Sequence, residues 1–257
     1  MKNRPNFTNT IEEWSNFFIP LNDGVQLAAR AWLPTNAIEQ PVPAILEYIP
    51  YRKRDGTAIR DEQMHPYWAA FGYACVRVDI RGSGESDGLL LDEYLQQELD
   101  DAVEVINWLE HQDWCSGKVG MMGKSWGGFN CLQVAALRPS ALKAIITVCS
   151  TDDRYADDCH YRGGAVLIEN FSWASTISGF MAKPPDPLLL PETWREHWLE
   201  RLQNIPFFAK NWLEHTYKDA YWKHGSINED YSAIKAAVYC VGGWGDAYSV
   251  AIPRMMQ

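Results

Sequence analysis

The chain has 257 residues, of which 47% are hydrophobic, so it can bury a large core as one large domain or two small ones. Its 23 basic and 33 acidic residues give a formal net charge of -10, which disfavours nucleic acid and anionic membranes as partners and favours a small-molecule substrate. The N-terminus lacks the apolar segment of a secretion signal, and no stretch reaches the roughly 18 apolar residues of a membrane span, so we expect a cytoplasmic protein.

The first elements along the chain are predicted to be strands. Apolar residues alternate on both sides of Asp23-Gly24, which predicts a hairpin within residues 17–34. Four later runs are rich in branched residues and are too short for independent helices, which is typical of buried parallel strands. These runs lie at residues 43–51, 73–80, 118–123 and 142–149.

Helices are expected between these strands. Apolar residues recur at spacings of three and four within residues 93–112, which predicts an amphipathic helix. The alternation predicts an α/β fold with a mainly parallel sheet over residues 1–150. Tryptophans and prolines then accumulate without strand alternation, so we expect a helical cap inserted at residues 151–234, and a return to the core sheet over residues 235–257.

The cysteines and histidines give no sign of a metal centre. The six cysteines are scattered without a C-x-x-C spacing, and Cys75, Cys149 and Cys240 fall in apolar runs, so we expect buried free thiols. No histidine and carboxylate pair has the spacing of metal ligands. The sequence therefore predicts neither a metal nor a cofactor.

Residues 117–128, GKVGMMGKSWGG, contain two competing motifs. A phosphate-binding loop ending in Gly123-Lys124-Ser125 requires glycine at position 118, which is lysine. The alternative, G-x-S-x-G, is a nucleophile elbow when it lies between a strand and a helix, as it does here. Ser125 would then be the nucleophile, and the backbone N–H of Trp126 would stabilise an oxyanion. A glycine-rich turn with an incidental serine is the remaining alternative.

Four segments in the same order resemble the cocaine esterase-like (CocE/NonD) hydrolases, a group that also includes X-prolyl dipeptidyl peptidases and α-amino acid ester hydrolases. They are residues 49–55, IPYRKRD; 76–88, VRVDIRGSGESDG; 117–128; and 241–248, VGGWGDAY. The resemblance implies an α/β-hydrolase fold with a helical cap. It also implies a C-terminal jelly-roll domain, for which the chain is too short.

The resemblance also implies roles for individual residues. Ser125 matches the nucleophile, Tyr51 the tyrosine whose hydroxyl supplies a second oxyanion donor, and Asp246 the acid that orients a histidine. The segment at 76–88 is interpreted as structural.

A histidine is expected after the acid, but residues 247–257 contain none. The chain is therefore expected to be the front part of a longer enzyme. Alternatively the base is another histidine of the chain or of a partner chain, with His160 the best internal candidate, or the protein is a non-catalytic ligand-binding module that keeps the fold.

The substrate class follows only broadly. An ester, an amide or a short peptide is expected. The aromatic residues of the cap, including Trp173, either form a hydrophobic core between the cap helices, which is the favoured interpretation, or suit a bulky apolar substrate group. Carboxylates that hold a substrate ammonium would separate an aminoacyl or peptidyl hydrolase from a simple esterase. The acidic segment 151–158, with Asp152, Asp153, Asp157 and Asp158, is the candidate, and a solvated face is the alternative. Because the last strand would lack a neighbour, we also expect association, for example as a homo-oligomer, or poor stability.

Overall fold

The computed structural model describes residues 9–257, in which seven strands form one sheet in the order β1-β2-β4-β3-β5-β6-β9. β1 and β2 are antiparallel, β2 pairs antiparallel with β4, and the remaining pairs are parallel. The strands are β1 (Ile11–Pro20), β2 (Gln26–Pro34), β3 (Val42–Ile49), β4 (Ala74–Asp79), β5 (Cys115–Lys124), β6 (Leu142–Val148) and β9 (Ala237–Val241). The predicted hairpin and mainly parallel sheet are confirmed.

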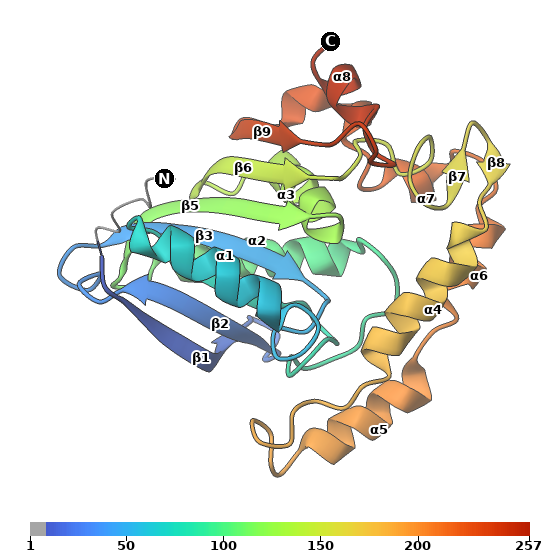
Figure 1. The fold of residues 1–257 in the computed structure, drawn as a ribbon. Coiled ribbons are helices and arrows are strands. Elements are labelled where there is room, and N and C mark those ends of the chain that lie inside the picture. The colour runs from blue at the N-terminus through green and yellow to red at the C-terminus, as the bar shows by residue number, and fades with distance from the viewer. Residues whose placement is uncertain (1–8) are drawn as a thin grey trace, which may run out of the picture.

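Helices cover both faces of the sheet (Figure 1). α1 (Ala58–Ala70) packs on one face against β2 and β4, whereas α2 (Gln96–Glu110) and α3 (Trp126–Ala136) pack on the other against β3 and β5. The α2 stripe predicted from the spacing of apolar residues faces the core: Leu99, Ala102, Ile106 and Leu109 are buried. Because parallel strands need crossover connections, all their carboxyl ends meet at one edge.

A set of short elements lies beyond that edge (Figure 1). They are β7 (Tyr161–Arg162), β8 (Ala165–Val166), α4 (Glu169–Met181), α5 (Trp194–Asn204), α6 (Phe208–Glu214), α7 (Ala220–Lys223), η1 (Ile227–Glu229) and η2 (Tyr231–Ala233), and after β9 comes α8 (Ala251–Met255). The β7–β8 pair is an addition to the expected helices. The domain boundaries themselves stay a prediction.

The edge strand β9 is more exposed than its apolar sequence suggests. Val238, Tyr239 and Val241 are exposed, because β9 has a partner on only one side within residues 9–257. All six cysteines are free. Cys75 is buried as predicted, but Cys149 and Cys240 are partly exposed, so burial was wrong for these two. Within the same residues no helix has the length and apolar character of a membrane-spanning segment.

Candidate active site

Ser125 occupies a strained turn between β5 and α3. Its backbone has φ 55° and ψ −120°, a left-handed φ that is uncommon for any residue other than glycine. The turn is fixed on both sides, since the Ser125 amide donates to the Val148 carbonyl (2.9 Å) and its carbonyl accepts from the Phe129 amide (3.0 Å). The serine side chain is partly exposed at the N-terminus of α3. This is the geometry that the elbow motif predicts.

The glycines around Ser125 are required by close backbone contact. A Cβ on Gly123 would lie 2.5 Å from backbone atoms of Gly127, and one on Gly127 would lie 2.8 Å from the side chain of Ile49. β5 and α3 therefore approach each other so closely that a side chain at position 123 or 127 would not fit. The G-x-S-x-G pattern is explained by this crossing, in which only glycine fits at both ends.

Tyr51 and Trp126 meet Ser125 at the same point. Burial raises the pKa of the Tyr51 phenol, while hydrogen bonds from the Ser125 side chain and the Trp126 amide act in the opposite direction. The phenol therefore lies between the serine hydroxyl and the first amide of α3. Helix N-terminal amides have no partner within their helix, so they are available to an oxyanion. The structure brings together three of the residues named from the sequence.

A buried carboxyl group, which the sequence did not indicate, holds the indole of Trp126. Its Nε1 donates to Glu98 Oε1 (2.5 Å), the Asn130 amide donates to the same oxygen (2.8 Å), and the Tyr94 amide donates to Oε2 (3.0 Å). Burial raises the pKa of Glu98 to about 7, although these donors lower it. Glu98 thus holds the indole of Trp126, the residue that follows the candidate nucleophile, in a fixed position.

Asp246 lies in the turn that follows β9, at the same edge of the sheet as Ser125. Its Oδ1 accepts from the Tyr248 amide (3.0 Å), whereas its buried Oδ2 receives no hydrogen bond from residues 9–257. The Cys149 thiol lies beside this carboxylate, and burial together with Asp246 raises the pKa of that thiol. An oxygen in this state can still accept a hydrogen bond from an imidazole.

A pocket of about 200 Å³ opens beside Ser125. Trp173, from α4, lies in its wall and contacts the rings of Tyr51 and Trp126 at centroid distances of 6.4 and 6.1 Å. Three acidic residues, Glu93, Asp158 and Glu169, also line it. The pocket therefore combines an aromatic wall with carboxylates, next to the serine.

Asp152 and Asp153 do not line this pocket. The Asp152 carboxylate is ion-paired with Arg254 and accepts a hydrogen bond from the Tyr231 hydroxyl. Asp153 accepts from Lys218 Nζ (2.9 Å) and from the Asn228 amide (2.7 Å). Both carboxylates therefore connect segments distant in sequence.

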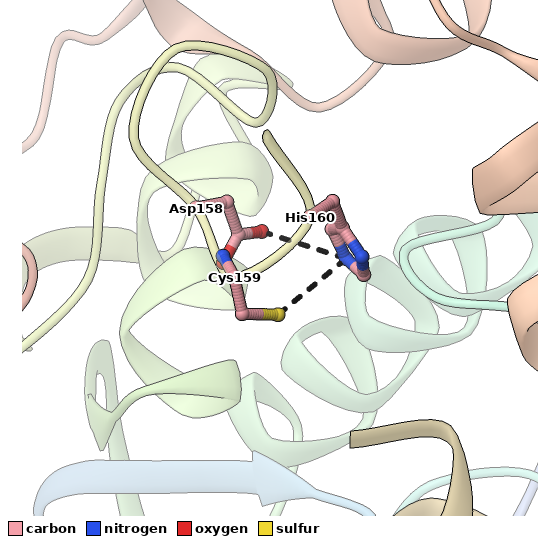
Figure 2. A group of neighbouring side chains, drawn as sticks. All are labelled: Asp158, Cys159 and His160. Atoms are coloured by element: carbon pink, nitrogen blue, oxygen red, sulfur yellow. Dashed lines mark hydrogen bonds and ion pairs between the residues drawn. The ribbon is translucent and has the colours of Figure 1, made fainter. Parts of the chain in front are cut away.

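His160, the best internal candidate for a base, is buried at the base of the cap. Its Nε2 lies 2.8 Å from Glu93 Oε2 and its Nδ1 lies 2.9 Å from Asn170 Oδ1, so both ring nitrogens are occupied. Burial lowers the pKa of His160, but Glu93 and Asp158 outweigh that effect and raise it. Figure 2 shows that the side chains of Asp158 and Cys159 also turn toward this ring.

The other histidines have neighbours elsewhere. His65 lies beside Glu47, His111 beside the Asn107 carbonyl, His197 near Asp87, His215 beside Asp219 and His224 beside the Tyr94 carbonyl. The structure gives none of the six histidines as a partner of Ser125 or Asp246, within the residues it describes.

The segment interpreted as structural, residues 76–88, is held by hydrogen bonds and ion pairs of its charged residues. Asp79 accepts from the Lys53 amide (3.0 Å) and pairs with Arg77 (3.2 Å), and Arg81 pairs with Asp101 (2.7 Å). None of these groups lines the pocket beside Ser125.

The sheet order, with the serine turn after β5 and the acidic turn after β9, defines an α/β-hydrolase fold. A family model described as X-Pro dipeptidyl-peptidase (S15 family) matches residues 23–255. The chain belongs to this family.

Individual relatives agree with this placement. Cocaine esterase of Rhodococcus sp. (strain MB1 Bresler) is 28% identical over 260 residues, which cover 91% of this chain and 44% of that enzyme. A CocE/NonD family hydrolase from Staphylococcus aureus superimposes with a TM-score of 0.68 at 22% identity, covering 87% of this chain and 39% of that one. An aminopeptidase from the marine sediment archaeon Thaumarchaeota archaeon gives a TM-score of 0.70 at 19% identity, covering 99% and 48%. The chain therefore spans less than half the length of these relatives.

Proposed function

We propose that this chain carries the nucleophile, the oxyanion donors and the orienting acid of a serine hydrolase that cleaves ester or amide bonds through an acyl-enzyme. The strained backbone of Ser125 carries this proposal, because a left-handed serine between a strand and a helix lifts its hydroxyl to the sheet edge. That the relatives include an esterase and an aminopeptidase favours hydrolysis over a non-catalytic binding module.

The mechanism assigns one role to each group. A base removes the Ser125 proton, Oγ attacks the carbonyl carbon, and the developing oxyanion takes hydrogen bonds from the Trp126 amide and the Tyr51 hydroxyl. In the resting structure the Tyr51 phenol is hydrogen-bonded to the Ser125 side chain and to the Trp126 amide. Because burial raises its pKa, Tyr51 stays protonated and can donate at neutral pH. Water then releases the acyl group.

The base is assigned to an imidazole other than the six histidines present, oriented by the free Oδ2 of Asp246. Carboxylates of Glu93, Asp158 and Glu169 line the Ser125 pocket, whereas Asp152 and Asp153 do not, so the pocket favours substrates with an amino group near the scissile bond. An aminoacyl or peptidyl substrate is therefore a second, finer part of the proposal.

The test is labelling with a fluorophosphonate probe, read by intact mass, with and without added imidazole. We expect imidazole to accelerate labelling of the native chain at one residue and to have no effect on Ser125→Ala. Tyr51→Phe should slow the imidazole-dependent labelling roughly a hundredfold, because one oxyanion donor is lost. Labelling that persists in Ser125→Ala, or a folded native chain that stays unlabelled with imidazole, would contradict the proposal.

A further inference from the structure

Three consecutive residues place ligand atoms of three kinds around one point in the pocket wall. His160 Nε2 lies 3.7 Å from Cys159 Sγ and 3.9 Å from Asp158 Oδ2, and the three atoms lie within 4.8 Å of one another (Figure 2). Glu93 Oε2 adds a second carboxylate 2.8 Å from the same nitrogen. Zinc ligands at about 2.0 to 2.3 Å in tetrahedral geometry are about 3.3 to 3.8 Å apart, so the first distance fits and the second would shorten slightly on binding.

The orientation of the His160 ring suits metal binding. Asn170 Nδ2 donates to the carbonyls of His160 (2.8 Å) and Leu167 (2.9 Å), which fixes its amide so that Oδ1 accepts from His160 Nδ1–H. Without a metal, Nε2 carries a proton that it donates to Glu93 Oε2 (2.8 Å), and loss of this proton would expose the Nε2 lone pair toward Cys159 and Asp158. Metal-binding histidines typically donate the N–H of their other ring nitrogen to a carbonyl or carboxylate oxygen, as His160 does to Asn170 Oδ1.

We propose that Asp158, Cys159 and His160, with Glu93, form a site for a borderline divalent metal of the Zn²⁺ class in the wall of the Ser125 pocket. Binding exchanges two protons, the one on His160 Nε2 and the one on Cys159 Sγ, for the metal ion. The site then holds two carboxylates and a thiolate, while the guanidinium of Arg154 acts on Glu93 and Asp158 from nearby. These charges sum to -2, which a divalent ion neutralises.

A second group of a histidine and carboxylates in the described chain has no excess negative charge for a metal ion to neutralise. Glu47, Asp61 and His65 are also close together, but Arg60 Nη2 lies 2.6 Å from Glu47 and 2.7 Å from Asp61. The buried Arg77 adds a second guanidinium, 3.4 Å from Asp61. Two fixed cations already neutralise these carboxylates, and no thiol is present, so this group serves as an internal comparison.

Metal binding is tested directly, whether or not Ser125 is a nucleophile. The whole chain is titrated with Co²⁺, followed by its visible absorption and thiolate charge-transfer band, and then with Zn²⁺ in competition and by calorimetry in two buffers. We expect one equivalent of bound ion, release of about two protons, and affinity that rises with pH as protons compete less. A folded chain that binds no Co²⁺ or Zn²⁺ would overturn the proposal.

Matched variants locate the ion. Cys159→Ser should abolish the charge-transfer band and weaken binding at least about tenfold, whereas Cys149→Ser, another partly exposed thiol, should leave both unchanged. His65→Gln should also leave both unchanged, provided that its melt stays cooperative. A band that survives in Cys159→Ser, or one that disappears in Cys149→Ser, would place the ion elsewhere and refute the assignment.

Discussion

Ser125 and Asp246 lie at the same edge of one sheet, but their surroundings differ. Ser125 is held by two backbone hydrogen bonds and a glycine crossing, and the indole next to it is fixed by Glu98. Asp246 lies in a turn whose neighbours Gly243, Trp244 and Gly245 are exposed, and one of its carboxylate oxygens accepts nothing from the described chain.

The Ser125 turn and the Asp246 turn therefore depend on the fold in different ways. The serine conformation costs of order 1–3 kcal/mol, and it persists only because its surroundings over-determine it. The acid needs little from the fold except position. Substitutions near Ser125 should therefore affect folding, and substitutions near Asp246 should scarcely do so.

The largest effect is expected at the glycine crossing. Gly123→Ala places a Cβ 2.5 Å from the Gly127 backbone, so strand and helix must separate, and the free energy of unfolding should fall by about 3 kcal/mol. Gly243→Ala is the matched control, since nothing lies within 4 Å of its Cβ, and it should change stability by less than about 1 kcal/mol. Urea unfolding followed by circular dichroism measures both. Equal losses would show that the elbow is no more constrained than the acid turn.

The next largest effect is a pH dependence of stability, which arises from Glu98, the residue that accepts a hydrogen bond from the Trp126 indole. The pKa of Glu98 is raised from 4.5 to about 7, so between these values the folded chain binds more protons than the unfolded chain. The free energy of unfolding should therefore fall as pH rises through this window, by up to roughly 3 kcal/mol. Glu98→Gln should remove this slope, because an amide does not titrate.

The control for this prediction lies on the same helix. Asp100 is exposed on α2, so Asp100→Asn should keep the slope of the native chain. Any loss of the Tyr94 hydrogen bond in Glu98→Gln is the same at every pH, which makes the slope the decisive quantity. An unchanged slope in Glu98→Gln would mean that Glu98 is ionised in the fold throughout this range.

Local patterns predicted the elbow, the hairpin and the parallel strands because each depends on residues close together in sequence. Ser125 is strained by its own neighbours, so a five-residue motif suffices. Asp158 lies in the acidic segment that the sequence singles out, but Glu93 could not be predicted in this way, because Glu93 and His160 are 67 residues apart and meet only through the fold. For the same reason the partners of Asp152 were not foreseen, since Arg254 is 102 residues away.

The proposed metal-ligand group depends on the fold in a different way. Asp158, Cys159 and His160 are adjacent in sequence, but they match no known ligand spacing, and only the turn of the loop directs their side chains to one point. A Cys-His pair preceded by aspartate is the only signal present in the sequence. It becomes informative once Glu93 and Asn170 are seen beside the imidazole.

The smallest effect on stability is expected at Asp246 itself. Asp246→Ala removes the acceptor of the partly buried Tyr248 amide and of the Cys149 thiol, which is a weak donor, so the free energy of unfolding should fall by only about 1 kcal/mol. The same variant should slow imidazole-dependent labelling of Ser125, because the added imidazole loses the carboxylate that orients it. A loss of several kcal/mol without any change in labelling would assign Asp246 to folding and remove it from the proposed catalytic group.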